Sequence, residues 1–305
     1  MRIVFMGTAE LASPCLEAVA KVPGYEVVAV VTQPDRPKGR DLKPMPPAVK
    51  VTAEQLGLPI QQPLKIREPA AVDSLRAIQP DLLIVVAYGQ ILPKAVLEIP
   101  SLGCINVHTS LLPRWRGAAP IQYAILHGDR ETGVTTMYMD EHMDTGDIIG
   151  QRAQMIHADD TSATLHDRLA KLGADLLVET VGLIAQGKTP RAKQDETLAT
   201  YAKKITKEDG RINWTRSAVE IERQIRAFNP WPGTHTHLDD LLLKIWKAEV
   251  VEGVSGNPGE LLPNFVVATG QGGLRIQELQ PANSKRMPID AFRRGHQVKV
   301  GSTLG

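Results

Sequence analysis

Short apolar runs alternate with helix-like segments through the first half of the chain, and this alternation restricts the fold more than any other feature. The strand-like runs are residues 3–6, 26–32, 81–86, 104–108 and 134–138. Between the first two, Ser13 is placed as a helix cap and Pro14 in the first turn of a helix that ends near Gly24. The pattern predicts an α/β fold with a Rossmann-like parallel sheet and helices on both faces.

Two polar side chains, Asn106 and His108, alternate with apolar ones in the fourth of these runs. Side chains two positions apart on a strand point to the same face, so both should meet one site. Pro113 and Gly117 follow, and such a segment cannot continue a strand. Both polar groups are therefore expected near the strand's carboxyl end, where open α/β sheets bind ligands. Taken alone, one Asn and one His would favour a different interpretation, in which Asn106 caps a turn and His108 is a satisfied, half-buried histidine.

The position of Asp144 favours a catalytic interpretation of Asn106 and His108 over a structural one. Asp144 lies in a loop that directly follows the strand-like run 134–138, so it is also expected at a strand end. A carboxylate beside an imidazole orients the ring and stabilises its charged form, and a neighbouring amide can donate to a developing oxyanion. Asn106, His108 and Asp144 together therefore suit acyl or formyl transfer to an amine.

Longer segments around these three residues resemble the signature segments of methionyl-tRNA formyltransferases. They read SLLPRWRGAAPIQ at 110–122 and DTGDI at 144–148. TQPDRP at 32–37 and AFNPWPG at 227–233 fit the same family, so the resemblance extends over almost the whole chain. It departs at His142, where a small residue is expected in the loop before Asp144.

The resemblance implies an activity and a set of site residues. The chain would transfer the formyl group of 10-formyltetrahydrofolate to the α-amino group of initiator methionyl-tRNA, which then serves translation initiation. The family's catalytic Asn, His and Asp correspond to Asn106, His108 and Asp144. Folate contacts are expected at Ser110, Leu111, Leu112 and Pro113. No metal is expected, because no His or Cys cluster has ligand spacing, and the pair His235 and His237 fits one face of an exposed strand.

A basic, proline-rich segment at 33–50 interrupts the alternation of strands and helices. Its prolines predict a long exposed loop without regular structure, and its cations outnumber Asp35 and Asp41. A solvated connection is one interpretation, although loops of this length are usually functional or disordered. The resemblance implies that the loop enters the acceptor end of the tRNA, where its cations pair with phosphates. The residues expected to do so are Arg36, Lys38, Arg40 and Lys43.

The rest of the chain predicts a linker and a second domain. A helical pattern from about 161 to 186 closes a catalytic domain at 1–187, and a basic linker is expected at 188–207, with Lys203, Lys204 and Lys207 facing the tRNA backbone. Residues 208–305 should form a tRNA-binding domain. It starts with a capping box at Ser217 and Glu220 and continues in strand patterns that suit a small barrel, similar to the family's oligonucleotide-binding-type domain.

Composition excludes several classes of protein. The chain of 305 residues has a formal net charge of +1, so any RNA-binding surface must be local. Cys15 and Cys104 lie in apolar surroundings and fit buried thiols of a reducing compartment. No leader sequence and no apolar run of about 20 residues is evident. We therefore expect a cytoplasmic enzyme that works as a monomer and does not enter a membrane.

Three alternative functions are less compatible with the sequence. A nicotinamide dehydrogenase needs Gly-x-Gly-x-x-Gly after the first strand, but residues 7–12 read GTAELA. A folate-dependent enzyme that acts on a nucleotide-sugar amine or a glycinamide ribonucleotide needs neither the basic loop nor the barrel. An RNA-binding protein with a degenerate enzyme fold would not need intact Asn106, His108 and Asp144.

Overall fold

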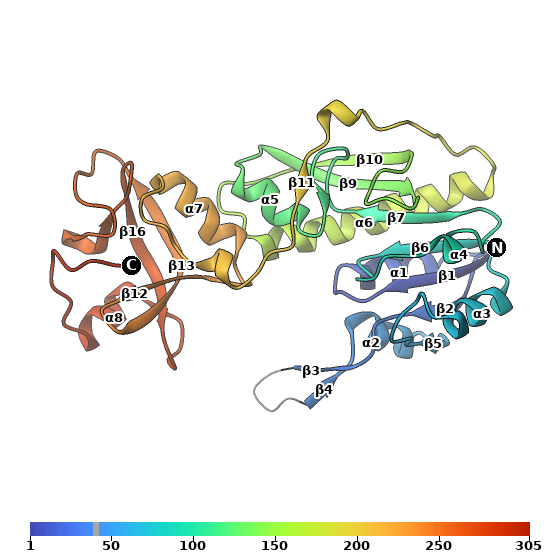
Figure 1. Cartoon of the computed structure of the whole chain (residues 1–305), viewed down its shortest axis with the longest axis horizontal. Helices are drawn as coiled ribbons and strands as arrows, with labels where there is room; N and C mark the ends of the chain where they lie inside the picture. Colours follow the sequence, from blue (N-terminus) through green and yellow to red (C-terminus); the bar gives the residue numbers. More distant parts are fainter. Residues whose placement is uncertain (39–42) are drawn as a thin grey trace. The chain divides into compact units, whose positions relative to one another are not determined.

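The computed structural model describes residues 1–38 and 43–305, and its contacts divide the chain into two compact units (Figure 1). The first unit consists of Met1–Pro120, Glu131–Met155 and His166–Ala202. The second consists of Ile121–Arg130, Ile156–Leu165 and Lys203–Gly305. The domain boundaries expected at residues 187 and 207 stay predictions.

A largely parallel sheet forms the centre of the first unit, with the strand order β10-β9-β7-β6-β1-β2-β5. These strands are β1 (Arg2–Gly7), β2 (Glu26–Val31), β5 (Ile60–Gln61), β6 (Leu82–Val86), β7 (Cys104–His108), β9 (Glu131–Tyr138) and β10 (Ile148–Met155). The strands from β5 to β7 are parallel to one another, whereas β9 is antiparallel to both β7 and β10. The predicted Rossmann-like fold is confirmed, with an antiparallel extension at the β7 edge.

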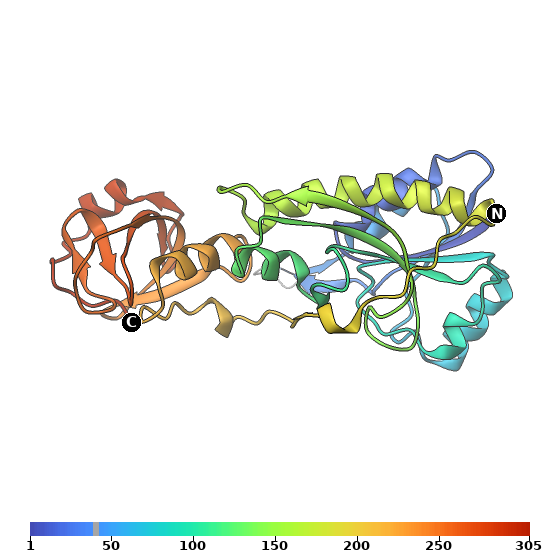
Figure 2. The ribbon, with the colours of Figure 1, turned by 90° about the horizontal axis from the view of Figure 1, so that it is seen from above.

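Helices cover both faces of this sheet (Figure 2). They are α1 (Ala12–Ala20), α2 (Ala48–Gln55), α3 (Pro69–Ile78), α4 (Lys94–Leu97) and α6 (Ser162–Ala185). The helix α5 (Pro120–Leu126) belongs, from Ile121 on, to the second unit. Gly173 brings the backbone of α6 against Val107, since a β-carbon there would lie 3.2 Å from a Val107 methyl group. Val85 of β6 packs instead with Leu75 of α3 and Val96 of α4. Val107 therefore points toward α6, and its neighbours on β7, Asn106 and His108, point to the opposite face.

The start of α1 differs from the expected one. Ser13 is not the cap, because the helix already begins at Ala12 and Leu11 occupies the N-cap position without a side-chain hydrogen bond. The backbone amides of Ala12 and Ser13 donate to the carbonyl oxygens of residues 9 and 10. A turn at residues 9–13 thus satisfies these amides, and the buried Ser13 hydroxyl has no hydrogen-bond partner among the described residues. Pro14 remains in the first turn, as expected.

The basic segment contains regular structure, so the prediction that its prolines exclude it is wrong. The strands β3 (Arg36–Lys38) and β4 (Lys43–Met45) form an antiparallel hairpin in which Pro37 lies opposite Pro44. A two-stranded ribbon tolerates proline because each strand is an edge, and a residue that needs no ladder hydrogen bond can lack its N–H. The helix α2 then begins at Ala48. Arg40 lies outside the described residues.

The expected linker is not a free connection along its whole length. Ala192 pairs with Ile148, the first residue of β10, and β11 (Tyr201–Ala202) pairs with the short strand β8 (Arg116–Gly117). A single 3-10 turn, η1 (Glu196–Leu198), lies between these two contacts. Residues 192–202 therefore belong to the first unit, even though their polar composition resembles that of a linker.

An antiparallel sheet with the order β12-β13-β16-β15-β14 forms the second unit, and β17 pairs with β16. Its elements are η2 (Glu208–Gly210), α7 (Ala218–Ala227), β12 (Thr234–Leu238), β13 (Leu241–Val251), β14 (Leu261–Leu262), η3 (Pro263–Phe265), β15 (Val266–Ala268), β16 (Gly273–Pro281), β17 (Met287–Pro288) and α8 (Ile289–Gly295). The helix α7 packs Ile221 and Ile225 into the core of this sheet. The predicted capping box at Ser217 and Glu220 is confirmed. The predicted β-type second domain is also confirmed.

Both cysteines are buried, and burial raises the pKa of each thiol to about 12. This agrees with the prediction that they are core residues. Within residues 1–38 and 43–305, no helix combines the length and apolarity that a membrane crossing requires.

Candidate functional site

Asn106, His108 and Asp144 lie together on one face of the central sheet. Nδ2 of Asn106 lies 3.5 Å from Oδ1 of Asp144, and Nδ1 of His108 lies 3.7 Å from Oδ2 of the same carboxylate. The side chains of His108 and Asp144 are 7% and 15% exposed, and Asn106 is half-buried. An amide, an imidazole and a carboxylate therefore meet in a shielded place near the surface.

Asp144 reaches this place by a route that the sequence does not predict. Because β9 is antiparallel to β7, Tyr138 at the end of β9 lies beside Ile105 near the start of β7. Residues 139–147 then turn back, and the amide of Tyr138 donates to the carbonyl oxygen of Asp147 at 2.9 Å, which closes the loop. Asp144 thus approaches Asn106 and His108 across the face of the sheet, not from a shared strand end.

The two ring nitrogens of His108 have different surroundings. Nε2 lies 2.9 Å from the carbonyl oxygen of Trp115. A carbonyl oxygen only accepts, so Nε2 carries a proton and donates it there. Nδ1 faces Asp144, so it is the nitrogen that is unprotonated when the ring is neutral and protonated when the ring is charged. Trp115, which the sequence analysis did not assign to the site, fixes this tautomer.

The Asp144 carboxylate has a further partner in the backbone. The amide of Gly117 donates to Oδ2 at 2.8 Å. Asp144 itself adopts a left-handed backbone conformation, with φ of 56°, which a residue other than glycine rarely adopts without outside support. Both Trp115 and Gly117 lie in the segment 110–122, which carried the family resemblance, although their contacts could not be read from the sequence.

A small cavity of about 190 Å³ lies beside Asp144. Its walls are mostly apolar and come from residues 90–92, Met137, Met139 and residues 140–144. Ile91 and Met143, two of its lining side chains, are 80% and 58% exposed. His142, where the sequence departs from the family pattern, also lines the cavity. Large apolar side chains that face water at a cavity indicate a place where a ligand covers them.

None of the four residues expected to contact folate lines this cavity. Ser110 is fully buried and its hydroxyl donates to the carbonyl oxygen of Arg114 at 2.6 Å. The amide of Leu112 donates to Oγ1 of Thr135, and its side chain is also buried. Leu111 and Pro113 are half-buried. Their assignment to folate stays a prediction.

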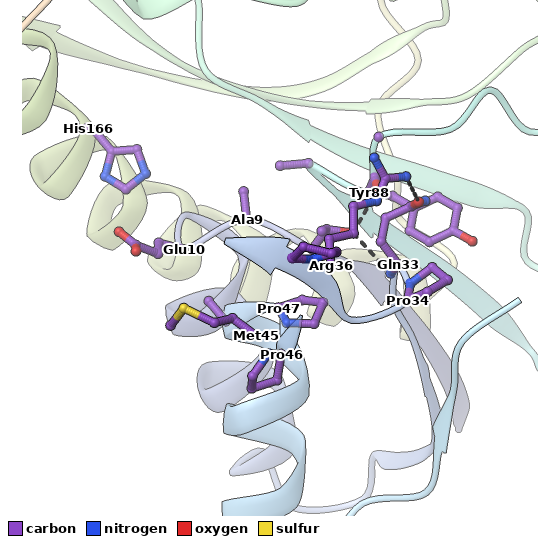
Figure 3. A pocket seen from close by; sticks show the side chains of 15 residues that line it. Ala9, Glu10, Gln33, Pro34, Arg36, Met45, Pro46, Pro47, Tyr88 and His166 are labelled. Atoms are coloured by element: carbon purple, nitrogen blue, oxygen red, sulfur yellow. Dashed lines mark hydrogen bonds between the residues drawn. The ribbon is translucent and has the colours of Figure 1, made fainter. Parts of the chain in front are cut away.

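A second cavity, of about 650 Å³, lies where β1, β2 and β6 end (Figure 3). Figure 3 shows Glu10 and His166 at one end of it and Gln33, Arg36 and Tyr88 at the other. Prolines and Met45 from the β3–β4 hairpin line it as well. The hairpin therefore forms part of a cavity at the edge of the sheet where ligands bind in this class of fold.

The basic residues expected to contact tRNA lie in both units. Arg36 is exposed and its Nη2 donates to Oε1 of Gln33 at 3.2 Å. Lys43 is exposed on β4, and Lys38 lies on β3. In the second unit, three further cations are exposed: Lys203, Lys204 and Lys207. In the described part of the chain, no group of three or more His, Cys, Asp or Glu side chains is arranged to hold a metal ion.

Comparison with known proteins identifies the family. The model of the formyl transferase family matches residues 1–181, and that of the formyl transferase C-terminal domain matches residues 204–297. A methionyl-tRNA formyltransferase from Citrifermentans bemidjiense is 51% identical over all of this chain and 96% of its own length. The chain belongs to the methionyl-tRNA formyltransferase family. The prediction from the sequence is thereby confirmed.

Other members of the family agree with this assignment. The methionyl-tRNA formyltransferases of Geobacter sulfurreducens and Methylococcus capsulatus are each 48% identical over the whole chain, and 97% and 100% of their own lengths are covered. The family uses 10-formyltetrahydrofolate as its formyl donor, so this co-substrate, predicted from the sequence, is also confirmed.

Solved structures share the fold at lower sequence identity. An N-formyltransferase from Helicobacter canadensis, in complex with folinic acid and dTDP-3-aminofucose, has a TM-score of 0.69 at 20% identity, with 93% of this chain and 99% of that chain covered. HypX from Aquifex aeolicus, in complex with tetrahydrofolic acid, has a TM-score of 0.63 at 18% identity, with 96% and 46% covered. At such identities the likeness concerns the fold alone.

Proposed function

We propose that this enzyme transfers the formyl group of 10-formyltetrahydrofolate to the α-amino group of initiator methionyl-tRNA, in the cytoplasm and as a monomer. Family membership supports the reaction. The observation that carries the site is that Asn106 and His108 each lie within 3.7 Å of the Asp144 carboxylate, on one face of the sheet. These three groups match the three tasks of the reaction.

The first task is to stabilise the formyl oxygen as it gains negative charge. Asn106 is suited to it, because an amide Nδ2 has two N–H groups and, among the residues that the structure describes, one long contact of 3.5 Å to Asp144 engages it. A donor fixed in a half-buried site acts on a developing oxyanion more strongly than water does. The folate donor, when bound, supplies a formyl group on a nitrogen that leaves as an amine.

The second and third tasks are proton transfers. The attacking amine loses a proton and the departing folate nitrogen gains one. His108 handles this exchange at Nδ1, since Nε2 is engaged by the Trp115 carbonyl group. The Asp144 carboxylate lies 3.7 Å from Nδ1 and stabilises the ring in its charged form. No covalent intermediate with the enzyme is required.

The folate donor fits the cavity beside Asp144. A flat heterocycle would cover the exposed apolar side chains of Ile91 and Met143, and the reacting carbon would then lie close to the carboxylate that forms part of the wall. The assignment of Ser110, Leu111, Leu112 and Pro113 to the folate rests on the family resemblance alone, because none of the four lines this cavity.

The tRNA would be held by the exposed cations. Arg36 and Lys43 lie on the hairpin beside the larger cavity of the first unit, which is suited to the acceptor end. Lys203, Lys204 and Lys207 in the second unit would meet backbone phosphates elsewhere on the molecule. Lys38 and Arg40 are proposed for the same role on sequence grounds.

A single assay tests the proposal. Formyl transfer from labelled 10-formyltetrahydrofolate is measured with initiator methionyl-tRNA, elongator methionyl-tRNA and small amino sugars as acceptors, for the wild type and for Asp144→Ala. We expect the initiator tRNA to have the highest kcat/KM and Asp144→Ala to lower it by orders of magnitude. An equal rate with small amines would overturn the acceptor, and wild-type turnover in Asp144→Ala would overturn the site.

A further inference from the structure

Gln194 connects the expected linker to the Asp144 loop. Its Nε2 donates to two backbone carbonyl groups of that loop, at 2.8 Å to Asp144 and 2.9 Å to Gly146. Both belong to the segment that turns back over the sheet. A primary amide has two N–H donors, so Gln194 uses both of them to fix the direction of the loop backbone.

The other end of the Gln194 side chain is fixed as well. Its Oε1 accepts from Nε and Nη2 of Arg116, at 3.0 and 2.8 Å. Arg116 is fully buried and is also bound by the carboxylate of Glu196, at 2.8 Å from Nη1 and 2.7 Å from Nη2. These hydrogen bonds raise the pKa of Arg116 and lower that of Glu196, so both side chains stay charged at neutral pH.

These contacts close a ring around Asp144. Gln194 donates to the carbonyl oxygen of Asp144, and the amide of Gly117 donates to the Asp144 carboxylate at 2.8 Å. Arg116 connects Gln194 with Gly117, because it binds the Gln194 side chain and directly precedes Gly117 in the chain. Such support matters because Asp144 has a left-handed backbone, with φ of 56°, which is less favourable than the right-handed region for any residue except glycine. Loss of Gln194 would remove the hydrogen bond to the Asp144 carbonyl group and with it one support of this conformation.

We propose that Gln194 is a positioning residue of the formyl transfer reaction, which acts by holding the Asp144 loop against Arg116. The inference rests on the proposed role of Asp144. It assigns a function in the active site to residues 192–202, a segment whose sequence resembles a linker. Glu196 and Arg116 take part by keeping the Gln194 amide in one orientation, so that both N–H groups point to the loop.

Gln194→Glu separates this role from a structural one. The change keeps an oxygen for Arg116 and adds an ion pair, but the new carboxylate cannot donate to the carbonyl groups of Asp144 and Gly146. We expect a melting temperature close to that of the wild type and a kcat lowered about tenfold to a hundredfold, the size of effect that a displacement of about 1 Å produces. KM for tRNA should stay the same. Gln194→Met, which loses both ends, should lower kcat similarly and also lower the melting temperature.

Gln224 supplies a matched control. It is buried, whereas Gln194 is half-buried, and its Nε2 likewise donates to two backbone carbonyl groups, of Asp209 and Arg211, in the second unit. Gln224→Glu should therefore lower stability without changing kcat or its pH profile. The pH profile of kcat for Gln194→Glu should shift relative to the wild type, because the imidazole of His108 loses its fixed carboxylate.

The outcomes distinguish this inference from the proposed function. If Asp144→Ala abolishes turnover while Gln194→Glu keeps the kcat and pH profile of the wild type, the positioning role of Gln194 is wrong and the active site stands. If Asp144→Ala itself keeps wild-type turnover, the proposed site is wrong. A loss of kcat in Gln194→Glu that only parallels a loss of melting temperature, as in Gln224→Glu, would also contradict the positioning role.

Discussion

The backbone amide of Gly117 donates to Oδ2 of Asp144 at 2.8 Å, and the same carboxylate oxygen lies 3.7 Å from Nδ1 of His108. One oxygen atom thus links the signature segment after β7 to the imidazole at the end of β7. A carboxylate fixed by a backbone group keeps its position when a substrate binds, which preorganises the charge at the site.

Gly117→Ala should therefore lower both activity and stability. Gly117 has φ of 110°, and a β-carbon there would lie 2.6 Å from the carbonyl oxygen of Ala202 in β11. The substitution has to displace β11 or the Gly117 amide, so kcat should fall at least tenfold and the melting temperature by several degrees. Gly182→Ala is the control, because no described atom outside its own helix turn lies within 4 Å of a β-carbon built there. Alanine in the interior of α6 should raise the free energy of unfolding by about 0.5–1 kcal/mol. Wild-type kcat in Gly117→Ala would disprove the expectation.

The roles of His108 and Asp144 predict a non-additive pair. Each alanine substitution should lower kcat by orders of magnitude with little change in tRNA affinity. Because the Asp144 carboxylate acts through the His108 ring that it faces, the double variant His108→Ala/Asp144→Ala should have a kcat only slightly lower than that of the worse single variant. Single-turnover rates for the four proteins of the cycle measure this directly. Losses that multiply would mean that the two side chains act independently.

The cavity beside Asp144 predicts a change in folate affinity. Ile91 is 80% exposed and lines this cavity, so Ile91→Asp should leave the melting temperature unchanged. It should raise Kd for the folate donor about tenfold, which corresponds to ~1.4 kcal/mol, since a charge replaces apolar surface that the ligand covers. Leu64→Asp is matched, because Leu64 is 75% exposed in the same unit and does not line this cavity. Equal Kd values for both variants would argue against folate at this place.

The exposed cations predict two different responses to salt. Lys203→Ala and Lys204→Ala should weaken binding of initiator and elongator tRNA alike, and each should lower the slope of log K against log salt by about one unit. Lys43→Ala, on the hairpin, should instead reduce kcat/KM more for the initiator than for the elongator tRNA, because specificity is a difference between two transition-state free energies. Proportional losses for both tRNAs in Lys43→Ala would reduce the hairpin to a general electrostatic contact.

The capping box of α7 predicts acid sensitivity of the second unit. Hydrogen bonds from Ser217, through its hydroxyl and amide, and from Arg216 lower the pKa of Glu220 to about 2. A carboxyl group with a lowered pKa stabilises the folded state above its unfolded pKa, and this contribution is lost as pH falls toward about 2. In the wild type, the melting temperature should therefore decline below pH 4.5 in part because Glu220 becomes protonated, and Glu220→Gln should lack this part of the decline. Ser217→Ala should lower the free energy of unfolding by about 1 kcal/mol. An unchanged decline in Glu220→Gln would contradict the assignment.

Features that depend on neighbouring residues were predictable from the sequence. The alternation of strands and helices gave the Rossmann-like sheet, and the two-residue period of a strand placed Asn106 and His108 on one face. The box of Ser217 and Glu220 is likewise local, since its hydrogen bonds join residues three positions apart. A local sequence pattern gave a wrong prediction where backbone amide groups found other hydrogen-bond partners. At Ser13, a preceding turn satisfied the amides that a cap would have bound.

The contacts that complete the site came only from the tertiary structure. Nothing in the sequence states that β9 is antiparallel, and this direction decides that the Asp144 loop must turn back over the sheet. Gly146 permits the turn, because a β-carbon there would lie 1.8 Å from the carbonyl oxygen of Tyr138. Gln194 lies in a polar segment without any motif, and its hydrogen bonds to the loop span 48 and 50 positions. The sequence determined which groups perform the chemistry, whereas the packing of distant segments decided how they are held, since hydrogen bonds between such segments leave no local pattern.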